Sequence, residues 1–127
     1  MDYDTLDKRL TKLKIEDFIW VIYIGIIILS WYGNSLERKY FIYNDLESRD
    51  KYRKTLIIIF SILLVLYLYI LKESYDELKI VDPNDSEKKK KLIFLSFLGS
   101  LFIAISGLIF LYIAVQDEEI NVEVAFN

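Results

Sequence analysis

The chain contains neither cysteine nor histidine among its 127 residues. Without cysteine, it has no disulfide bond and no thiolate for a metal ion or a redox reaction. Without histidine as well, the common ligand sets for zinc, copper and haem iron are missing, and neither a Ser–His nor a Cys–His catalytic pair can form. The sequence therefore predicts a protein that is not an enzyme and holds no metal or cofactor.

Glycine and proline are also scarce, with 4 Gly and 1 Pro, and the glycine-rich loops that cradle phosphates are absent. The formal net charge is −3, from 16 basic and 19 acidic residues, and no basic face with interleaved aromatics is present. This balance argues against a nucleic-acid partner, and no small-molecule substrate is inferred. The excess of Ile and Lys over Ala and Arg is typical of an AT-rich genome, as in low-GC bacteria.

Charge is missing from three long stretches, Phe18–Leu36, Thr55–Leu71 and Leu92–Gln116. As helices with a rise of ~1.5 Å per residue, these stretches extend ~28, ~25 and ~37 Å, close to the ~30 Å hydrocarbon core of a bilayer. All acidic and basic residues lie in the remaining segments: 1–17, 37–54, 72–91 and 117–127. We therefore predict one all-α integral membrane domain over 1–127, with transmembrane helices at 18–36, 55–71 and 92–116.

Segment 1–17 carries apolar residues at helical spacing, namely Tyr3, Leu6, Leu10 and Leu13. This pattern predicts a short amphipathic helix before the first span. Such a helix either lies in the headgroup plane or packs its leucines against the ends of the bundle. The segment mixes acidic with basic residues and is followed by no small-residue cleavage site, so we do not expect a cleaved signal peptide.

Aromatic residues mark both ends of the first predicted span: Trp20, Tyr23, Trp31 and Tyr32. Trp and Tyr favour the membrane interfaces, where the ring body is apolar and its polar tip is wet. Gly33–Asn34 predicts a weakening or an end of this helix. The following aromatic run, Tyr40–Tyr43, is too short to span and is predicted to anchor segment 37–54 at the interface.

The second and third spans are predicted to form a long antiparallel hairpin. Asn44 followed three residues later by Glu47 resembles a capping box, so the second helix should begin near Asp45 and continue past the membrane to Val81. Asp82 and Pro83 fit the cap and the first position of the third helix. The hairpin tip is thus predicted within 72–91.

The tail, 117–127, is acidic and alternates apolar with polar residues at Ile120, Val122 and Val124. Alternation with a period of two predicts a short strand, but an isolated strand is not stable. The segment therefore either finds a strand partner or remains a disordered tail.

Basic residues predict the orientation, because cytoplasmic loops carry an excess of Lys and Arg. With the N-terminus inside, segments 1–17 and 72–91 place ten Lys and Arg in the cytoplasm, against six outside in 37–54. The prediction is a multi-pass protein of the cell membrane with a cytoplasmic N-terminus and an external C-terminus. Lys88, Lys89, Lys90 and Lys91 then anchor the hairpin tip at the headgroups or attract anionic lipid.

The third span has one side built from small residues: Ser96, Gly99, Ser100, Ala104, Ser106, Gly107 and Ala114. Small residues let helix backbones approach closely in lipid, where no hydrophobic force joins helices. This helix-packing face is predicted to contact the other helices of the chain, a second copy, or the water of a pore. Ile103, Phe110 and Leu111 lie in the same sector and argue against the pore.

Together these features predict a small non-catalytic membrane subunit or regulator. It acts by helix–helix packing in the lipid bilayer, as a homo-oligomer or with a larger membrane protein. The alternative is a holin-like or toxin-like oligomer that permeabilises the membrane, although the acidic tail differs from the basic C-terminus of many holins.

Overall fold

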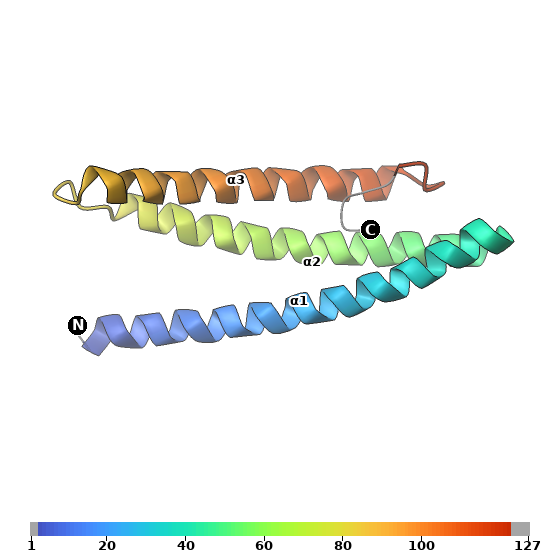
Figure 1. Cartoon of the computed structure of the whole chain (residues 1–127), viewed down its shortest axis with the longest axis horizontal. Coiled ribbons are helices and arrows are strands. Elements are labelled where there is room, and N and C mark those ends of the chain that lie inside the picture. The colour runs from blue at the N-terminus through green and yellow to red at the C-terminus, as the bar shows by residue number, and fades with distance from the viewer. Residues whose placement is uncertain (1–2, 123–127) are drawn as a thin grey trace.

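A computed structural model describes residues 3–122 as three long helices joined by short connections (Figure 1). Helix α1 spans Tyr3–Tyr43, α2 spans Leu46–Lys79 and α3 spans Glu87–Gln116. Consecutive helices run in opposite directions, so the connection after α1 and the end of α3 lie at one end of the molecule. The prediction of an all-helical protein is confirmed for the described residues, which contain no strand.

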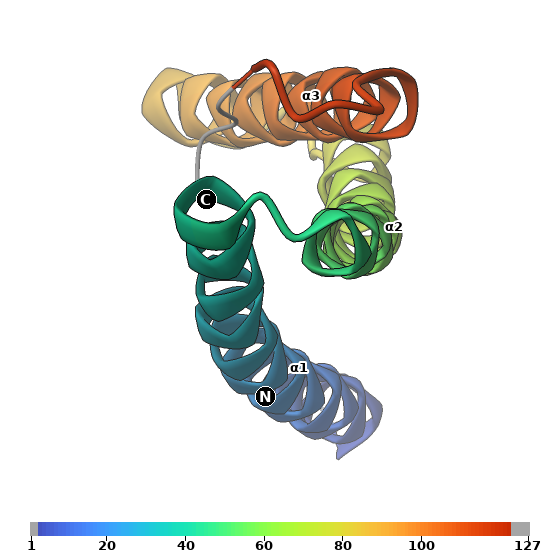
Figure 2. The same cartoon turned by 90° about the vertical axis from the view of Figure 1, so that its right-hand side faces the viewer.

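Helix α2 is the central element, because it packs against both α1 and α3. Viewed along the helices, α1 and α3 lie on two different sides of α2, so that the bundle is open (Figure 2). Within the described residues, α1 and α3 have no backbone contact with one another. Helix α1 lies close to α2 near its own C-terminal end and diverges from it towards its N-terminal end (Figure 1).

The core follows α2, whose buried side chains are Ser48, Tyr52, Thr55, Leu56, Ile59, Phe60, Leu63, Leu66 and Ser74. The outer helices bury much less, and large apolar side chains such as Trp31 and Tyr112 are 77% and 67% exposed. Within residues 3–122, α2 and α3 are the two helices found long and apolar enough to cross a membrane. Only 33% and 17% of their most apolar stretches are buried, whereas a core helix of a water-soluble protein is largely buried.

The predictions of a separate short helix within segment 1–17 and of a helix weakened or ended at Gly33–Asn34 are wrong. One helix runs without interruption from Tyr3 to Tyr43. Gly33 is buried, and a Cβ atom built on it would lie 3.6 Å from side-chain atoms of Thr55 and Tyr52. The close packing of α1 on α2 at this point compensates for the ~1 kcal/mol by which glycine disfavours a helix.

Helix α2 begins where the sequence predicts, but its cap is Asp45 and not Asn44. The Asp45 carboxylate accepts hydrogen bonds from the Glu47 N–H, at 3.1 Å, and from the Ser48 hydroxyl, at 2.8 Å. These bonds, led by that of Ser48, lower the pKa of Asp45. Asn44 has a φ of 50°, a left-handed conformation that Asn tolerates, and this residue turns the chain from α1 into α2.

The predicted start of α3 at Asp82–Pro83 is also wrong. Helix α2 ends at Lys79, and the residues between Asp82 and Asp85 form a turn closed by a 2.9 Å hydrogen bond from the Asp85 N–H to the Asp82 carbonyl. The cap of α3 is Ser86, whose hydroxyl oxygen accepts a hydrogen bond from the Lys89 N–H at 3.1 Å. The acidic side chains therefore stabilise the turn, and the serine begins the helix.

The described part of the tail forms a turn and not the predicted strand. The Asp117 carboxylate accepts hydrogen bonds from the Asn121 and Val122 N–H groups, at 2.9 and 2.8 Å. Ile120 has a φ of 56°, which is incompatible with an extended strand. Val124, the last residue of the predicted alternation, lies outside the described residues.

Candidate functional site

The interface between α2 and α3 is built on small residues of α3. Ser100, Ala104, Gly107 and Ala114 are its buried residues. A Cβ atom built on Gly107 would lie 2.9 Å from Cδ2 of Tyr67, which is closer than carbon atoms pack. Glycine at this position therefore lets the tyrosine ring lie directly against the backbone of α3.

A buried hydrogen bond joins the same two helices nearer the α2–α3 connection. The hydroxyl oxygens of Ser74 and Ser100 lie 2.8 Å apart, and the Ser100 hydroxyl donates to the Ser96 carbonyl at 2.9 Å. Since a hydroxyl has one hydrogen, Ser74 is the donor and Ser100 the acceptor in the interhelical bond. The sequence did not identify Ser74 or Tyr67 as residues that contact α3, although Ser74 lies only three residues beyond the uncharged stretch Thr55–Leu71.

The remaining residues of the predicted helix-packing face, Ser96, Gly99 and Ser106, are exposed. A Cβ atom built on Gly99 would meet nothing within 4 Å. Gly99 and Ser106 are seven residues apart and so share one side of α3. The structure thus separates the predicted face into a set that is buried against α2 and a set that is exposed.

The four consecutive lysines lie in the first turns of α3 beside the connection from α2. Lys89 forms an ion pair with Asp85 at 3.2 Å. Lys90 lies 3.6 Å from a Glu87 carboxylate oxygen and donates a 2.7 Å hydrogen bond to the Pro83 carbonyl. Lys88 and Lys91 are exposed. Half of this cluster therefore stabilises the turn and the other half faces the surroundings.

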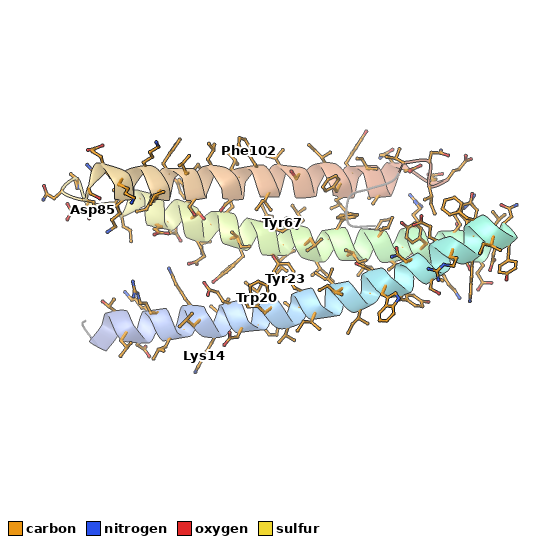
Figure 3. All side chains as sticks on the ribbon, in the orientation of Figure 1. Lys14, Trp20, Tyr23, Tyr67, Asp85 and Phe102 are labelled. Carbon is orange, nitrogen blue, oxygen red and sulfur yellow. The ribbon has the colours of Figure 1, made fainter. Side chains whose placement is uncertain are left out.

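The predicted interfacial aromatics lie along α1. Trp20 and Tyr23 form a tilted pair with ring centroids 5.7 Å apart, while Trp31 and Tyr32 are exposed further along the helix. Trp20, Tyr23 and Trp31 line cavities where α1 and α2 diverge. Figure 3 shows Tyr23 directed from α1 towards α2 at the level of Tyr67.

The space between α1 and α2 holds two neighbouring cavities that share Trp20 and Tyr23 in their linings, and the two together are called here the α1–α2 groove. The larger has a volume of about 720 Å³, and apart from the shared pair its lining is mostly apolar: Ile26, Ile27, Ser30, Trp31, Asn34, Ile59, Leu63 and Tyr67. The smaller, about 480 Å³, has a charged lining that includes Lys12, Glu16, Glu73 and Glu77. One end of the groove is therefore polar and the other apolar.

An ion pair crosses the polar end of the groove. Lys12 Nζ lies 3.1 Å from Glu73 Oε2, and this hydrogen-bonded carboxylate raises the pKa of Lys12. Glu16 and Glu77 line the same cavity, and the salt bridges found within residues 3–122 do not include either of them. The pair ties the diverging part of α1 to α2 and leaves two carboxylates beside it.

At the opposite end of the molecule, an arginine of α2 closes the end of α3. The Arg53 guanidinium donates a hydrogen bond to the Val115 carbonyl, one of the last carbonyls of α3, which have no partner inside the helix. The positive charge also lies at the negative end of the helix dipole. Arg53 therefore fixes the C-terminal end of α3 against α2.

The described residues provide helix interfaces and a groove, and they contain no cluster of three or more His, Cys, Asp or Glu side chains able to hold a metal ion. Comparison with family models, curated proteins and solved structures found no match for the chain.

Proposed function

We propose that the chain is a multi-pass integral membrane protein that acts without catalysis, as a subunit or regulator that packs its helices against a second copy or a larger membrane partner. The observation that carries this proposal is the exposure of apolar side chains along all three helices. In water such a surface favours aggregation, whereas in a bilayer it faces lipid or another helix at no comparable cost.

Helix α1 is proposed as a third span beside α2 and α3. Its uncharged stretch, Phe18–Leu36, lies alongside the apolar part of α2, and Ile19 and Ile26 of α1 pack into the same core. The exposed Trp20 and Trp31 then lie towards the two interfaces. The proposed orientation places the N-terminus in the cytoplasm, together with the turn between α2 and α3.

The open bundle supports a role in packing. Helix α3 buries only Ser100, Ala104, Gly107 and Ala114 within the chain, so most of its circumference is free for lipid or a partner. Gly99 and Ser106 supply small residues on one exposed side, which is the composition that close helix packing in membranes requires.

Single-cysteine variants test the location and the orientation, because the natural chain has no cysteine to remove. We expect a membrane-impermeant maleimide to label Asn44→Cys and Asn121→Cys in intact cells. Asp7→Cys and Asn84→Cys should react only after the membrane is opened. If Asp7→Cys reacts together with Asn44→Cys, α1 does not cross the membrane. A chain that stays monodisperse in buffer without any amphiphile would overturn the membrane assignment.

Assembly is tested with Ser106→Cys and Ile105→Cys, which lie at the same depth on different sides of α3. We expect Ser106→Cys to form a disulfide-linked product, with a second copy or with Cys introduced in a co-purified partner, and Ile105→Cys to form much less. Mass measurement in a gentle detergent identifies the product. A monomer in native membranes with no crosslink from either position contradicts the packing role, and dye leakage on expression would favour the pore instead.

A further inference from the structure

We propose that the α1–α2 groove binds a single-chain cationic amphiphile, with its positively charged head group at the Glu16 and Glu77 end and its hydrocarbon tail along the apolar end. This inference goes beyond helix packing and depends only on the membrane location. The two cavities that form the groove have volumes of about 480 and 720 Å³. Cavities of this size, ~300–1,000 Å³, hold small organic ligands in other proteins.

The charge of the polar end selects a cation. Three glutamates and one lysine line this cavity, and the lysine is already bound to Glu73 at 3.1 Å. Within the lining of this cavity, two negative charges therefore remain in excess, those of Glu16 and Glu77, although Glu77 also lines a neighbouring cavity with Lys88 and Lys89. An anionic or neutral head group leaves them uncompensated, whereas an ammonium group between them provides the missing positive charge.

Aromatic rings adjoin these carboxylates. Trp20, Tyr23 and Tyr69 line the same cavity as Glu16 and Glu77. The face of an aromatic ring attracts an ammonium group, including one that carries methyl groups and cannot donate a hydrogen bond. Carboxylates together with rings thus favour a quaternary ammonium head group over an inorganic cation, which prefers a shell of oxygen ligands.

The apolar end fits a hydrocarbon chain. It continues from Trp20 and Tyr23 past Ile27 and Trp31, with Ile59 and Leu63 of α2 on the opposite wall. In the sequence, Glu16 precedes the uncharged stretch of α1 and Glu73 follows that of α2. The polar end therefore lies at the headgroup level and the apolar end within the bilayer, which is the orientation that a membrane-dissolved amphiphile already has.

The inference is tested by titrating dodecyltrimethylammonium into the full chain in phosphatidylcholine nanodiscs and following tryptophan emission, since both tryptophans line the groove. We expect saturable binding by the natural chain. The variant Glu16→Gln with Glu77→Gln should bind about tenfold more weakly, because two ion pairs are lost. The control variant, Glu37→Gln with Glu47→Gln, has the same net charge with both changes outside the groove, and it should bind like the natural chain.

Dodecanol, with the same tail and no charge, separates charge recognition from simple filling of an apolar space. Binding of dodecanol as tight as that of the ammonium compound overturns the proposal, and so does equal binding by the groove variant and the control variant.

Circular dichroism reports whether the double variant folds. If it does not fold, the single variants Glu16→Gln and Glu77→Gln replace it, each expected to bind about threefold more weakly. A disulfide between two copies of Ile27→Cys, unaffected by the amphiphile, would show that a second chain occupies the groove and would also overturn the proposal.

Discussion

The hydroxyl oxygens of Ser74 and Ser100 lie 2.8 Å apart in the buried interface between α2 and α3. Ser100 also donates to the Ser96 carbonyl, so the three residues form a short chain of hydrogen bonds from α2 into the backbone of α3. In a bilayer such bonds are a principal source of helix association, and measured interhelical side-chain bonds contribute ~0.6 kcal/mol on average.

The Ser74–Ser100 bond is tested by a double-mutant cycle. Ser74→Ala and Ser100→Ala should each lower the free energy of unfolding, and the double variant should lose less than the sum, with a coupling of about 0.6–1.7 kcal/mol. Unfolding by a denaturing detergent in mixed micelles measures these values. Ser106→Ala, at an exposed position of the same helix, is the control and should leave the monomer's stability unchanged. Strict additivity would show that the two hydroxyls do not interact.

Gly107 and Gly99 form a matched pair of positions on α3. Gly107→Ala brings a methyl group to 2.9 Å from the Tyr67 ring, and the overpacking should cost about 1–3 kcal/mol. Gly99→Ala meets no atom within 4 Å and should stabilise the isolated chain slightly, by up to ~1 kcal/mol, since alanine favours a helix. Detergent unfolding measures both changes. Tyr67→Leu should partly rescue Gly107→Ala, and equal effects of the two alanine variants would contradict the packing described.

Arg53 should hold the C-terminal end of α3 in place. Arg53→Met removes the hydrogen bond to the Val115 carbonyl and should destabilise the chain by about 1 kcal/mol. Amide hydrogen exchange should become faster in the last turn of α3 and in the turn around Asp117, and much less near Ser100. The neighbouring Lys54 is exposed, so Lys54→Met serves as the control. Uniform acceleration along α3 would instead indicate global destabilisation.

The Lys12–Glu73 ion pair should make the attachment of α1 to α2 dependent on alkaline pH. The hydrogen bond that Lys12 donates to the Glu73 carboxylate raises the pKa of Lys12 above its ordinary value of 10.5. The pair therefore stabilises the folded chain below about pH 10.5 and is lost as the pH rises through the higher pKa of the folded state. Because both side chains are partly exposed, its contribution should be ~0.2–1 kcal/mol.

We expect the natural chain to be more stable than Glu73→Gln at pH 8 and the two to converge as the pH rises through the raised pKa of Lys12. Unfolding of both proteins across this range measures the difference. A difference that grows with pH would show that the lysine is not the titrating partner.

The helical content and the position of α2 follow from local sequence patterns. The uncharged stretches and the polar residues before α2 act over a few residues, so spacing and composition are sufficient to predict the helices and the start of α2, although not that Asp45 and not Asn44 is the cap. The start of α3 depends instead on competition between neighbouring caps. Asp82 and Asp85 form hydrogen bonds within the turn, and the Ser86 hydroxyl caps α3 instead. Because Asp and Ser are both good caps, residue type alone does not decide whether the helix begins after Asp82 or after Ser86.

Other features depend on contacts between distant segments. Gly33 favours the end of a helix when considered alone, but its packing against Tyr52 and Thr55 keeps α1 continuous. The seven small residues of α3 form one face by helical spacing, and only the position of α2 determines which of them it covers. The groove exists because α1 diverges from α2, and neither the residues of α1 alone nor those of α2 alone indicate this divergence.

Tyr67 borders two different parts of the molecule, because its ring packs against Gly107 of α3 and also lines the α1–α2 groove. Since the backbones of the outer helices do not approach one another within the described residues, a displacement of α1 is transmitted to α3 through α2. A rotation of this one ring would alter the shape of the groove and the fit of α3 at the same time. The side chain of Tyr67 is thus shared between the α2–α3 interface and the α1–α2 groove.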